Sequence, residues 1–268
     1  MSATDTVFAG SIPRIYDRYM VPMLFAPYAQ EMARRAQAFA PSSILETAAG
    51  TGVVTQALHQ ALPKASIVAT DLNEPMLEQA ATRLGGAGVR FEPANAQDLP
   101  FDDSSFDLVA CQFGVMFFPD KVRANAEARR VLKDGGHYML GIWDRIERNV
   151  ATRAAGQAVA ALFPNDAGAF YERIPFRYFE QDGIRADLSA AGFEDVQIES
   201  VELMSRAPSA RDAAIGFVQG TPMRSEIEKR DPAMVAVATE AATEALRQFE
   251  GANGFEAPTS ALIVTATK

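Results

Sequence analysis

Predicted strands alternate with predicted helices through residues 43–143, and this alternation constrains the fold more than any other feature of the chain. Short apolar runs typical of buried strands are separated by segments in which apolar residues recur at helical spacing. The strands are expected at residues 44–45, 66–71, 89–91, 106–111 and 137–143, and the helices at 53–62, 74–84 and 121–133. Strands joined through helices pair in parallel by right-handed crossovers. The pattern therefore predicts a parallel α/β sheet.

The segments outside this alternation are predicted to extend the same domain, which covers residues 1–268. Residues 1–42 are expected to form an N-terminal helical cap, which Pro22 and Pro27 divide into short pieces. Residues 43–143 form the ligand-binding core, and Gly85 and Gly86 end its second helix. Residues 144–190 and 205–255 are predicted cap or lid insertions, and residues 195–204 and 260–267 are predicted closing strands.

A glycine-containing turn follows the first predicted strand, and a helix follows the turn. Backbone N–H groups at the start of a helix lack intrahelical partners and carry partial positive charge. Gly50 and Gly52 allow a ligand to approach the main chain closely. Asp71, at the end of the next strand, can accept hydrogen bonds from both hydroxyls of a ribose, or it can cap the following helix. These positions favour a nucleotide-type ligand at the carboxyl edge of the sheet.

Two ligands fit this turn, and its side chains favour one of them. The dinucleotide fingerprint places a third glycine three residues after the second, where this chain has Thr55. Glu46, directly before the turn, is unfavourable beside a pyrophosphate but attracts an ammonium or sulfonium group. The electrostatics therefore favour a cationic adenosyl ligand over NAD, and an NAD(P)-dependent oxidoreductase stays the alternative.

Four segments of the alternating region match a known family. They read LETAAGTG at residues 45–52, ATDLNEPML at 69–77, NAQDLPF at 95–101 and RVLKDGG at 130–136. In these segments the chain resembles a class I S-adenosylmethionine-dependent methyltransferase of the small-molecule type. The resemblance covers residues 43–143 and implies a Rossmann-like α/β fold, whose mostly parallel sheet has seven strands, helices on both faces and an antiparallel last strand. It also implies S-adenosylmethionine as the cofactor and S-adenosylhomocysteine as its product.

The resemblance implies a role for each matched position. The implied cofactor contacts are Glu46, Ala48, Gly50, Gly52 and Gln112 at the methionine end, Asp71 at the ribose, and Leu72, Asn95, Ala96 and Gln97 at the adenine, with Asp98 as the alternative to Asn95. Ala48 stands where the family usually has its first glycine, so the loop should be wider or keep a negative φ. Asn95 stands where an aspartate is common, and Asp134 stands where a proline is frequent.

Methyl transfer from a sulfonium needs few catalytic groups from the protein, because the cofactor carries the leaving group. We therefore expect positioning and exclusion of water, and no side chain is named as a catalytic base. An aromatic and methionine-rich mouth is expected to bind the acceptor, with Phe113, Met116, Phe117 and Tyr28 as its residues. Tyr16 and Tyr19 are expected to close over the methionine part of the cofactor. The acceptor should be a small, apolar or partly aromatic molecule that is methylated at O, N or C.

Composition argues against several other classes of protein. The net charge of −9 disfavours a nucleic-acid partner, and with it a nucleic-acid methyltransferase. With one cysteine, Cys111, and two histidines, His59 and His137, neither a disulfide nor a metal centre is expected. Cys111 should be a buried, inert thiol, and neither histidine is favoured as a base. Without a signal or membrane-spanning segment we expect a cytoplasmic protein with no membrane partner. A homodimer is compatible with the sequence, and cofactor binding without turnover stays a further alternative.

Overall fold

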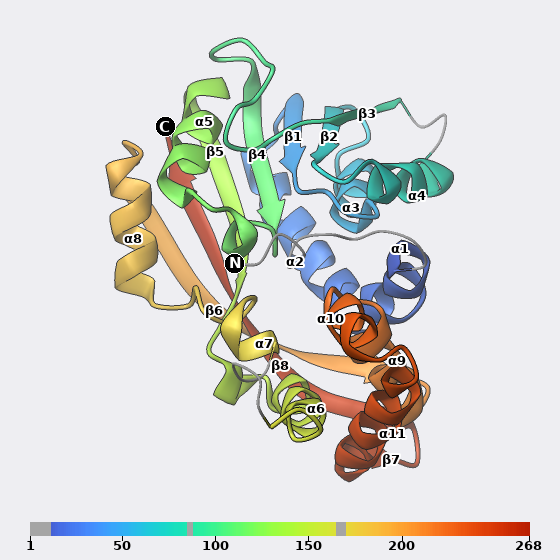
Figure 1. The fold of residues 1–268 in the computed structure, drawn as a ribbon. Coiled ribbons are helices and arrows are strands. Elements are labelled where there is room, and N and C mark those ends of the chain that lie inside the picture. Colours follow the sequence, from blue (N-terminus) through green and yellow to red (C-terminus); the bar gives the residue numbers. More distant parts are fainter. Residues whose placement is uncertain (1–11, 85–87, 165–169) are drawn as a thin grey trace. The chain divides into compact units, whose positions relative to one another are not determined.

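The computed structural model of the protein describes residues 12–84, 88–164 and 170–268 (Figure 1). Three predicted features lie partly outside these residues: the start of the N-terminal cap at 1–11, the helix end at Gly85 and Gly86, and residues 165–169 of the first cap insertion. The chain divides into two compact units. Unit 1 comprises the described parts of Met1–Pro27, Asp144–Arg177 and Glu202–Ser260, and unit 2 comprises those of Tyr28–Trp143, Tyr178–Val201 and Ala261–Lys268. The predicted single domain with its segment boundaries stays a prediction.

Within the described residues, the strands form a sheet in the order β3-β2-β1-β4-β5-β8-β6, and β7 pairs with β8 off this path. The strands are β1 (Ser43–Thr47), β2 (Ser66–Asp71), β3 (Val89–Pro93), β4 (Phe106–Gln112), β5 (Leu132–Trp143), β6 (Asp195–Ala207), β7 (Glu250–Gly251) and β8 (Gly254–Thr267). Strands β1 to β5 pair in parallel, whereas β8 runs antiparallel to β5. This arrangement confirms the predicted Rossmann-like sheet with an antiparallel last strand, and the short β7 is an addition to it.

The central strands of unit 2 are covered on both faces. Ile44 and Leu45 on β1, and Leu108 and Val109 on β4, have no exposed surface. Because consecutive residues of a strand point to opposite faces, such continuous burial requires helices on both sides of the sheet. The helices of this unit are α2 (Ala26–Ala36) from Tyr28 onward, η2 (Gln37–Phe39), α3 (Val53–Ala61), α4 (Glu74–Leu84), η3 (Val115–Phe117), α5 (Lys121–Val131) and α8 (Gln181–Ala190).

Unit 1 carries the remaining helices together with the end of β6, all of β7 and the start of β8. Its helices are α1 (Ile12–Ile15), η1 (Tyr16–Phe25), η4 (Ile146–Arg148), α6 (Val150–Ala160), α7 (Phe170–Arg173), α9 (Ala210–Gln219), α10 (Met223–Arg230), α11 (Met234–Leu246) and η5 (Arg247–Phe249). The predicted break at Pro22 is wrong, because η1 is a π-helix that continues through this residue. Its wider turn accommodates a residue without an N–H donor. No helix within the described ranges has both the length and the apolar character needed to cross a membrane.

The strand β5 begins earlier than predicted, at Leu132 rather than residue 137, and α5 ends at Val131 rather than residue 133. The pairing of β4 with β5 shifts between Phe106 and Leu108, so the residues before His137 form an irregular extension of the strand. The chain end fixes this extension, because Lys268 N–H donates to Gly136 O over 3.0 Å. Strand β8 is also longer than predicted. Both differences arise from pairing between distant segments, which local periodicity does not reveal.

Candidate functional site

The turn after β1 lies against the end of β2. Gly50 N–H donates to Asp71 Oδ2 over 2.9 Å. Gly52 has a φ of +78°, and a Cβ atom added to it would lie 2.9 Å from Ala80 Cβ on α4. Position 52 therefore needs glycine both for its backbone conformation and for the close approach of α4. The glycine turn and the acidic end of β2 meet at one edge of the sheet, as predicted.

Two residues other than glycine adopt left-handed backbone conformations at this edge. Ala48, after β1, has a φ of +53°, and Phe113, after β4, has a φ of +55°. Of the two expectations for Ala48, a wider loop or a negative φ, the negative φ is wrong. Alanine fits because residue 114 is glycine, whose added Cβ would lie 2.5 Å from Ala48 Cβ. Each such conformation costs about 1–2 kcal/mol. Strain of this kind concentrates at functional sites, and here it follows two paired strands.

Two buried carboxyl groups lie at the same edge. Glu46 is 1% exposed, and Thr55 Oγ1 donates to its Oε2 over 2.6 Å. Burial, together with the neighbouring Asp71, raises the pKa of Glu46 to about 8. Burial also raises the pKa of Asp71, although the backbone N–H groups of Asn73 and Gly50 donate to its carboxylate and oppose the rise. Asp71 thus combines contacts to the turn and to the start of the α4 segment. A cationic ligand would stabilise the charged form of both carboxyls.

Two threonines at the turn were not identified from the sequence as functional. In the sequence, Thr55 is notable only as the position where the dinucleotide fingerprint has its third glycine, but its hydroxyl donates a hydrogen bond to Glu46. Thr51 Oγ1 is buried and has no hydrogen-bond partner among the described residues. Because buried polar groups are nearly always satisfied, an orphaned hydroxyl in a glycine turn indicates a ligand contact. The only signal in the sequence for the contact of Thr55 is its position nine residues after Glu46.

The predicted adenine segment lies next to the end of β2. Ala94 N–H donates to Asp71 O over 3.1 Å. Leu72 is 69% exposed, so a large apolar side chain is available at this edge. Asn95 Oδ1 accepts from Gln97 N–H, and Gln97 Oε1 accepts from Asp120 N–H at the start of α5. The side chains of Asn95 and Gln97 therefore hold the loop itself, and the backbone around Ala96 stays as the predicted adenine contact.

The end of β4 carries an aromatic layer. Phe113 stacks on Trp143 with ring centroids 3.7 Å apart, and Tyr28 meets both rings edge-on at 5.4 and 5.7 Å. Tyr28 is fully buried, and its hydroxyl donates to Val201 O over 3.2 Å. Gln112 lies beside Gly141 on β5, where an added Cβ would be 3.1 Å from Gln112 Cγ. Trp143 was predicted only as a strand residue, since nothing local links it to Phe113.

Other predicted residues lie apart from this edge or are buried. Among the acceptor-site residues, Met116 is buried and Phe117 is half-buried on η3. Tyr16 and Tyr19 belong to unit 1, so their closure over the cofactor stays a prediction. Cys111 is fully buried, which confirms the predicted buried thiol, and burial raises its pKa to about 11. His137, midway along β5, stacks on Phe39.

A Rossmann-like sheet with a glycine turn and an acid pair at its carboxyl edge defines an α/β protein that binds a nucleotide-type cofactor. A family model described as a methyltransferase domain matches residues 45–140. A demethylmenaquinone methyltransferase from Deinococcus radiodurans is 34% identical over 206 residues, which cover 71% of this chain and 85% of that protein. A malonyl-[acyl-carrier protein] O-methyltransferase from Geobacter sulfurreducens is 34% identical over 165 residues, which cover 61% of this chain and 60% of that protein.

A solved structure, described as an S-adenosylmethionine-dependent methyltransferase and possible histamine N-methyltransferase from Thermotoga maritima, shares the fold. Its TM-score is 0.57 at 21% identity, and the match covers 96% of this chain and 98% of that one. The chain belongs to the class I S-adenosylmethionine-dependent methyltransferases. This membership confirms the predicted family and enzyme class, and it decides against the NAD(P)-dependent oxidoreductase.

The family implies S-adenosylmethionine as the methyl donor, and the residues at the edge fit this cofactor. The buried carboxyls of Glu46 and Asp71 suit its positive charge, the exposed Leu72 suits a flat adenine ring, and the orphaned Thr51 hydroxyl lies in the turn that the methionine end would approach.

Proposed function

We propose that the protein transfers the methyl group of S-adenosylmethionine to a small molecule with an apolar, partly aromatic body. The observation that carries this proposal is the stack of Phe113 on Trp143 at the end of β4, beside Gln112. A flat ring gains most from such a layer, because aromatic pairs stack or meet edge-on. The names of the Deinococcus and Geobacter relatives include a demethylmenaquinone and a carrier-bound malonyl group. The aromatic layer favours the quinone-type ring over the malonyl group.

The cofactor contacts are proposed residue by residue. Asp71 accepts hydrogen bonds from the ribose hydroxyls, Leu72 packs on the adenine, and the backbone at Ala96 meets the adenine edge. Glu46 and the turn at Gly50 surround the methionine end, where opposite charge stabilises the ligand. Further contacts at this end are proposed for Ala48, Gly52, Gln112, Tyr16 and Tyr19.

The protein contributes position and desolvation to the reaction. S-adenosylmethionine, when bound, supplies a methyl group on a sulfonium centre, which is a good leaving group. The aromatic layer holds the acceptor in line with that bond, which converts a bimolecular reaction into an oriented one. The acceptor would lose its proton to solvent when the methyl group is transferred, and the proposal assigns no protein base to this step. Phe113 and Trp143 exclude water from the acceptor side.

A labelled-methyl assay tests the proposal. The wild-type protein is incubated with labelled S-adenosylmethionine and a reduced demethylmenaquinone-type quinol, a simple phenol, an amine, a small carboxylic acid or RNA. We expect transfer to the hydroxylated aromatic compounds. Tight S-adenosylhomocysteine binding with no transfer to any compound would instead favour binding without turnover, and transfer to RNA would revive a nucleic-acid substrate.

A pair of variants locates the acceptor site. Phe117→Ala removes a half-buried ring at the carboxyl edge, and Phe39→Ala removes a half-buried ring that stacks on His137 near the amino edge. We expect Phe117→Ala to raise the KM for the aromatic acceptor about 10-fold, the equivalent of ~1.4 kcal/mol. The KM for S-adenosylmethionine should stay unchanged, and Phe39→Ala should change neither constant. Equal effects of the two variants would contradict the proposed location.

A further inference from the structure

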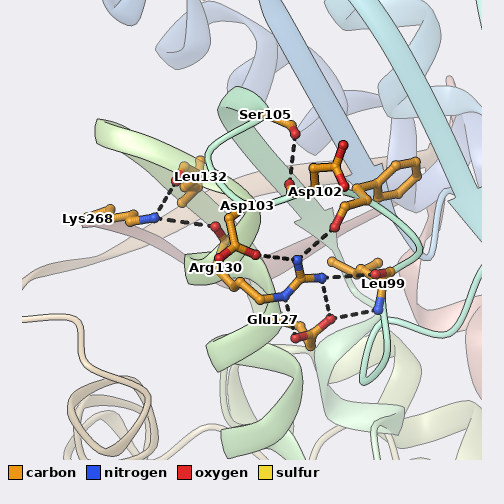
Figure 2. Close-up of polar contacts among 9 residues, drawn as sticks. Leu99, Asp102, Asp103, Ser105, Glu127, Arg130, Leu132 and Lys268 are labelled. Carbon is orange, nitrogen blue, oxygen red and sulfur yellow. Dashed lines mark hydrogen bonds and ion pairs between the residues drawn. The ribbon is translucent and has the colours of Figure 1, made fainter.

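One face of α5 reaches across to the loop that follows the predicted adenine segment (Figure 2). Arg123, Glu127 and Arg130 recur at a spacing of four and three residues, so they share a helix face. Arg123 Nε donates to Gln97 O over 2.7 Å, and Glu127 Oε2 accepts from Leu99 N–H over 2.8 Å. The three charged side chains thus form hydrogen bonds with backbone groups of the loop. Substitution of the loop's own side chains would leave these hydrogen bonds in place.

Arg130 is the centre of this network. Its Nη2 donates to Leu99 O over 2.9 Å and its Nη1 to Phe101 O over 2.7 Å. The same guanidinium forms a bidentate pair with Glu127, with both N–O distances at 2.8 Å, and a further contact with Asp103 Oδ1 at 2.8 Å. Such a planar fork has no equivalent in lysine. Arg130 lowers the pKa of Glu127, which stays ionised and keeps its oxygens as acceptors.

The network continues from this loop to the candidate cofactor edge. Asp120, whose side chain caps α5, donates its N–H to Gln97 Oε1 over 2.6 Å. Asn95 Oδ1 accepts from Gln97 N–H over 3.0 Å. Ala94 N–H in turn donates to Asp71 O over 3.1 Å. The position of the backbone at residues 94–98 therefore depends on contacts that α5 supplies on one side and β2 on the other.

We propose that Arg130, supported by Glu127 and Arg123, is a positioning residue for the adenine edge of the cofactor. By fixing the main chain at Gln97, Leu99 and Phe101, it sets the place at which the backbone of residues 95–97 meets the ring. The inference rests on the proposed function, in which this segment contacts adenine.

The test compares two ligands on matched variants. Calorimetry measures the Kd of S-adenosylhomocysteine and of S-inosylhomocysteine, in which a carbonyl replaces the adenine amino group. The variants are Arg130→Met, Arg130→Lys and the control Arg129→Met, since Arg129 donates instead to Gly192 O next to α8. We expect the wild type and Arg129→Met to prefer S-adenosylhomocysteine. Arg130→Met should lose about 10- to 100-fold in affinity for it and most of the preference, and Arg130→Lys should lie between.

The outcomes separate the inference from the proposed function. A wild type that does not bind S-adenosylhomocysteine overturns the proposed function. A wild type that binds it, with Arg130→Met weakening both ligands by the same factor or neither, overturns the positioning role and leaves the function standing. If Arg130→Met does not fold, Arg123→Met removes the hydrogen bond to Gln97 O and should lower the preference in the same direction. An unchanged preference in a folded Arg123→Met protein also counts against the inference.

Discussion

The pKa values of acidic side chains shift in opposite directions at the two ends of the parallel sheet. At the amino end, Asp107 on β4 accepts from Lys133 Nζ over 2.8 Å and from Ser42 and Ser43. Burial works to raise the pKa of Asp107, but these hydrogen bonds outweigh it and lower the pKa. At the carboxyl end, burial raises the pKa of Glu46 to about 8, and its neighbours are a hydroxyl and Asp71. Lys133 is the cation at the amino end, and the sulfonium of the cofactor is the proposed cation at the carboxyl end.

The largest effect is expected when the same substitution is made at both ends. Asp71→Asn should weaken S-adenosylhomocysteine binding about 100-fold (~3 kcal/mol), because hydrogen bonds to a charged acceptor are lost at the ribose. Asp107→Asn should leave the Kd unchanged, since its side chain accepts hydrogen bonds from Lys133, Ser42 and Ser43 at the amino end of the sheet. Calorimetry on both variants checks this. Equal affinities of the two variants for S-adenosylhomocysteine would contradict the proposed difference between the two ends of the sheet.

The next effect concerns two glycines with positive φ, one at each end. Gly52→Ala adds a left-handed alanine and a clash with Ala80, and should lower the free energy of unfolding by about 3 kcal/mol. Gly135 has a φ of +75°, but no described residue has an atom within 4 Å of an added Cβ. Gly135→Ala should therefore cost only about 1–2 kcal/mol. Chemical denaturation compares the two. A larger loss at Gly135 would show that the carboxyl-edge turn is not the tightly packed one.

The smallest effect is a pH-dependent one at the amino end. The pKa of Asp107 is lowered in the folded state, so its contribution to stability is present above the unfolded value near 4 and is lost as the pH falls further. The Lys133–Asp107 pair is partly exposed, and Lys133→Met should cost less than about 1 kcal/mol at pH 7. The cost should stay constant down to pH ~4 and shrink only as the pH falls further, toward the lowered folded-state pKa of Asp107. Denaturation curves at pH 7 check the source of the cost: Lys133→Met should cost less in an Asp107→Asn background, and an equal cost in both backgrounds would exclude Asp107 as its partner.

Much of the fold follows from local signals. The alternation of strands and helices in residues 43–143, the glycine turn and the acid at Asp71 all depend on short segments whose periodicity and turn residues are visible in the sequence. The extension of β5 to Leu132 was missed because it depends on pairing with the chain end at Lys268.

The site was harder to predict where contacts are tertiary. The expectation at Ala48 was a wider loop or a negative φ, since the sequence does not show that Gly114 makes room for its methyl group. The hydrogen bond from Thr55 to Glu46 joins a helix to a strand, and the stack of Phe113 on Trp143 joins two strand ends. These contacts decide the charge and shape of the edge, and none of them has a periodic signature.

The number of protons released on cofactor binding at pH 7 tests most directly whether the carboxyl edge is built for a cation. With a pKa of about 8, Glu46 is largely protonated before binding, and a sulfonium nearby favours its ionised form. Calorimetry in buffers of different ionisation enthalpy counts the protons for S-adenosylmethionine and for the neutral sulfide S-adenosylhomocysteine. We predict more release with S-adenosylmethionine, up to about one proton, and loss of this difference in Glu46→Gln. Equal release for the two ligands in the wild type would contradict the account.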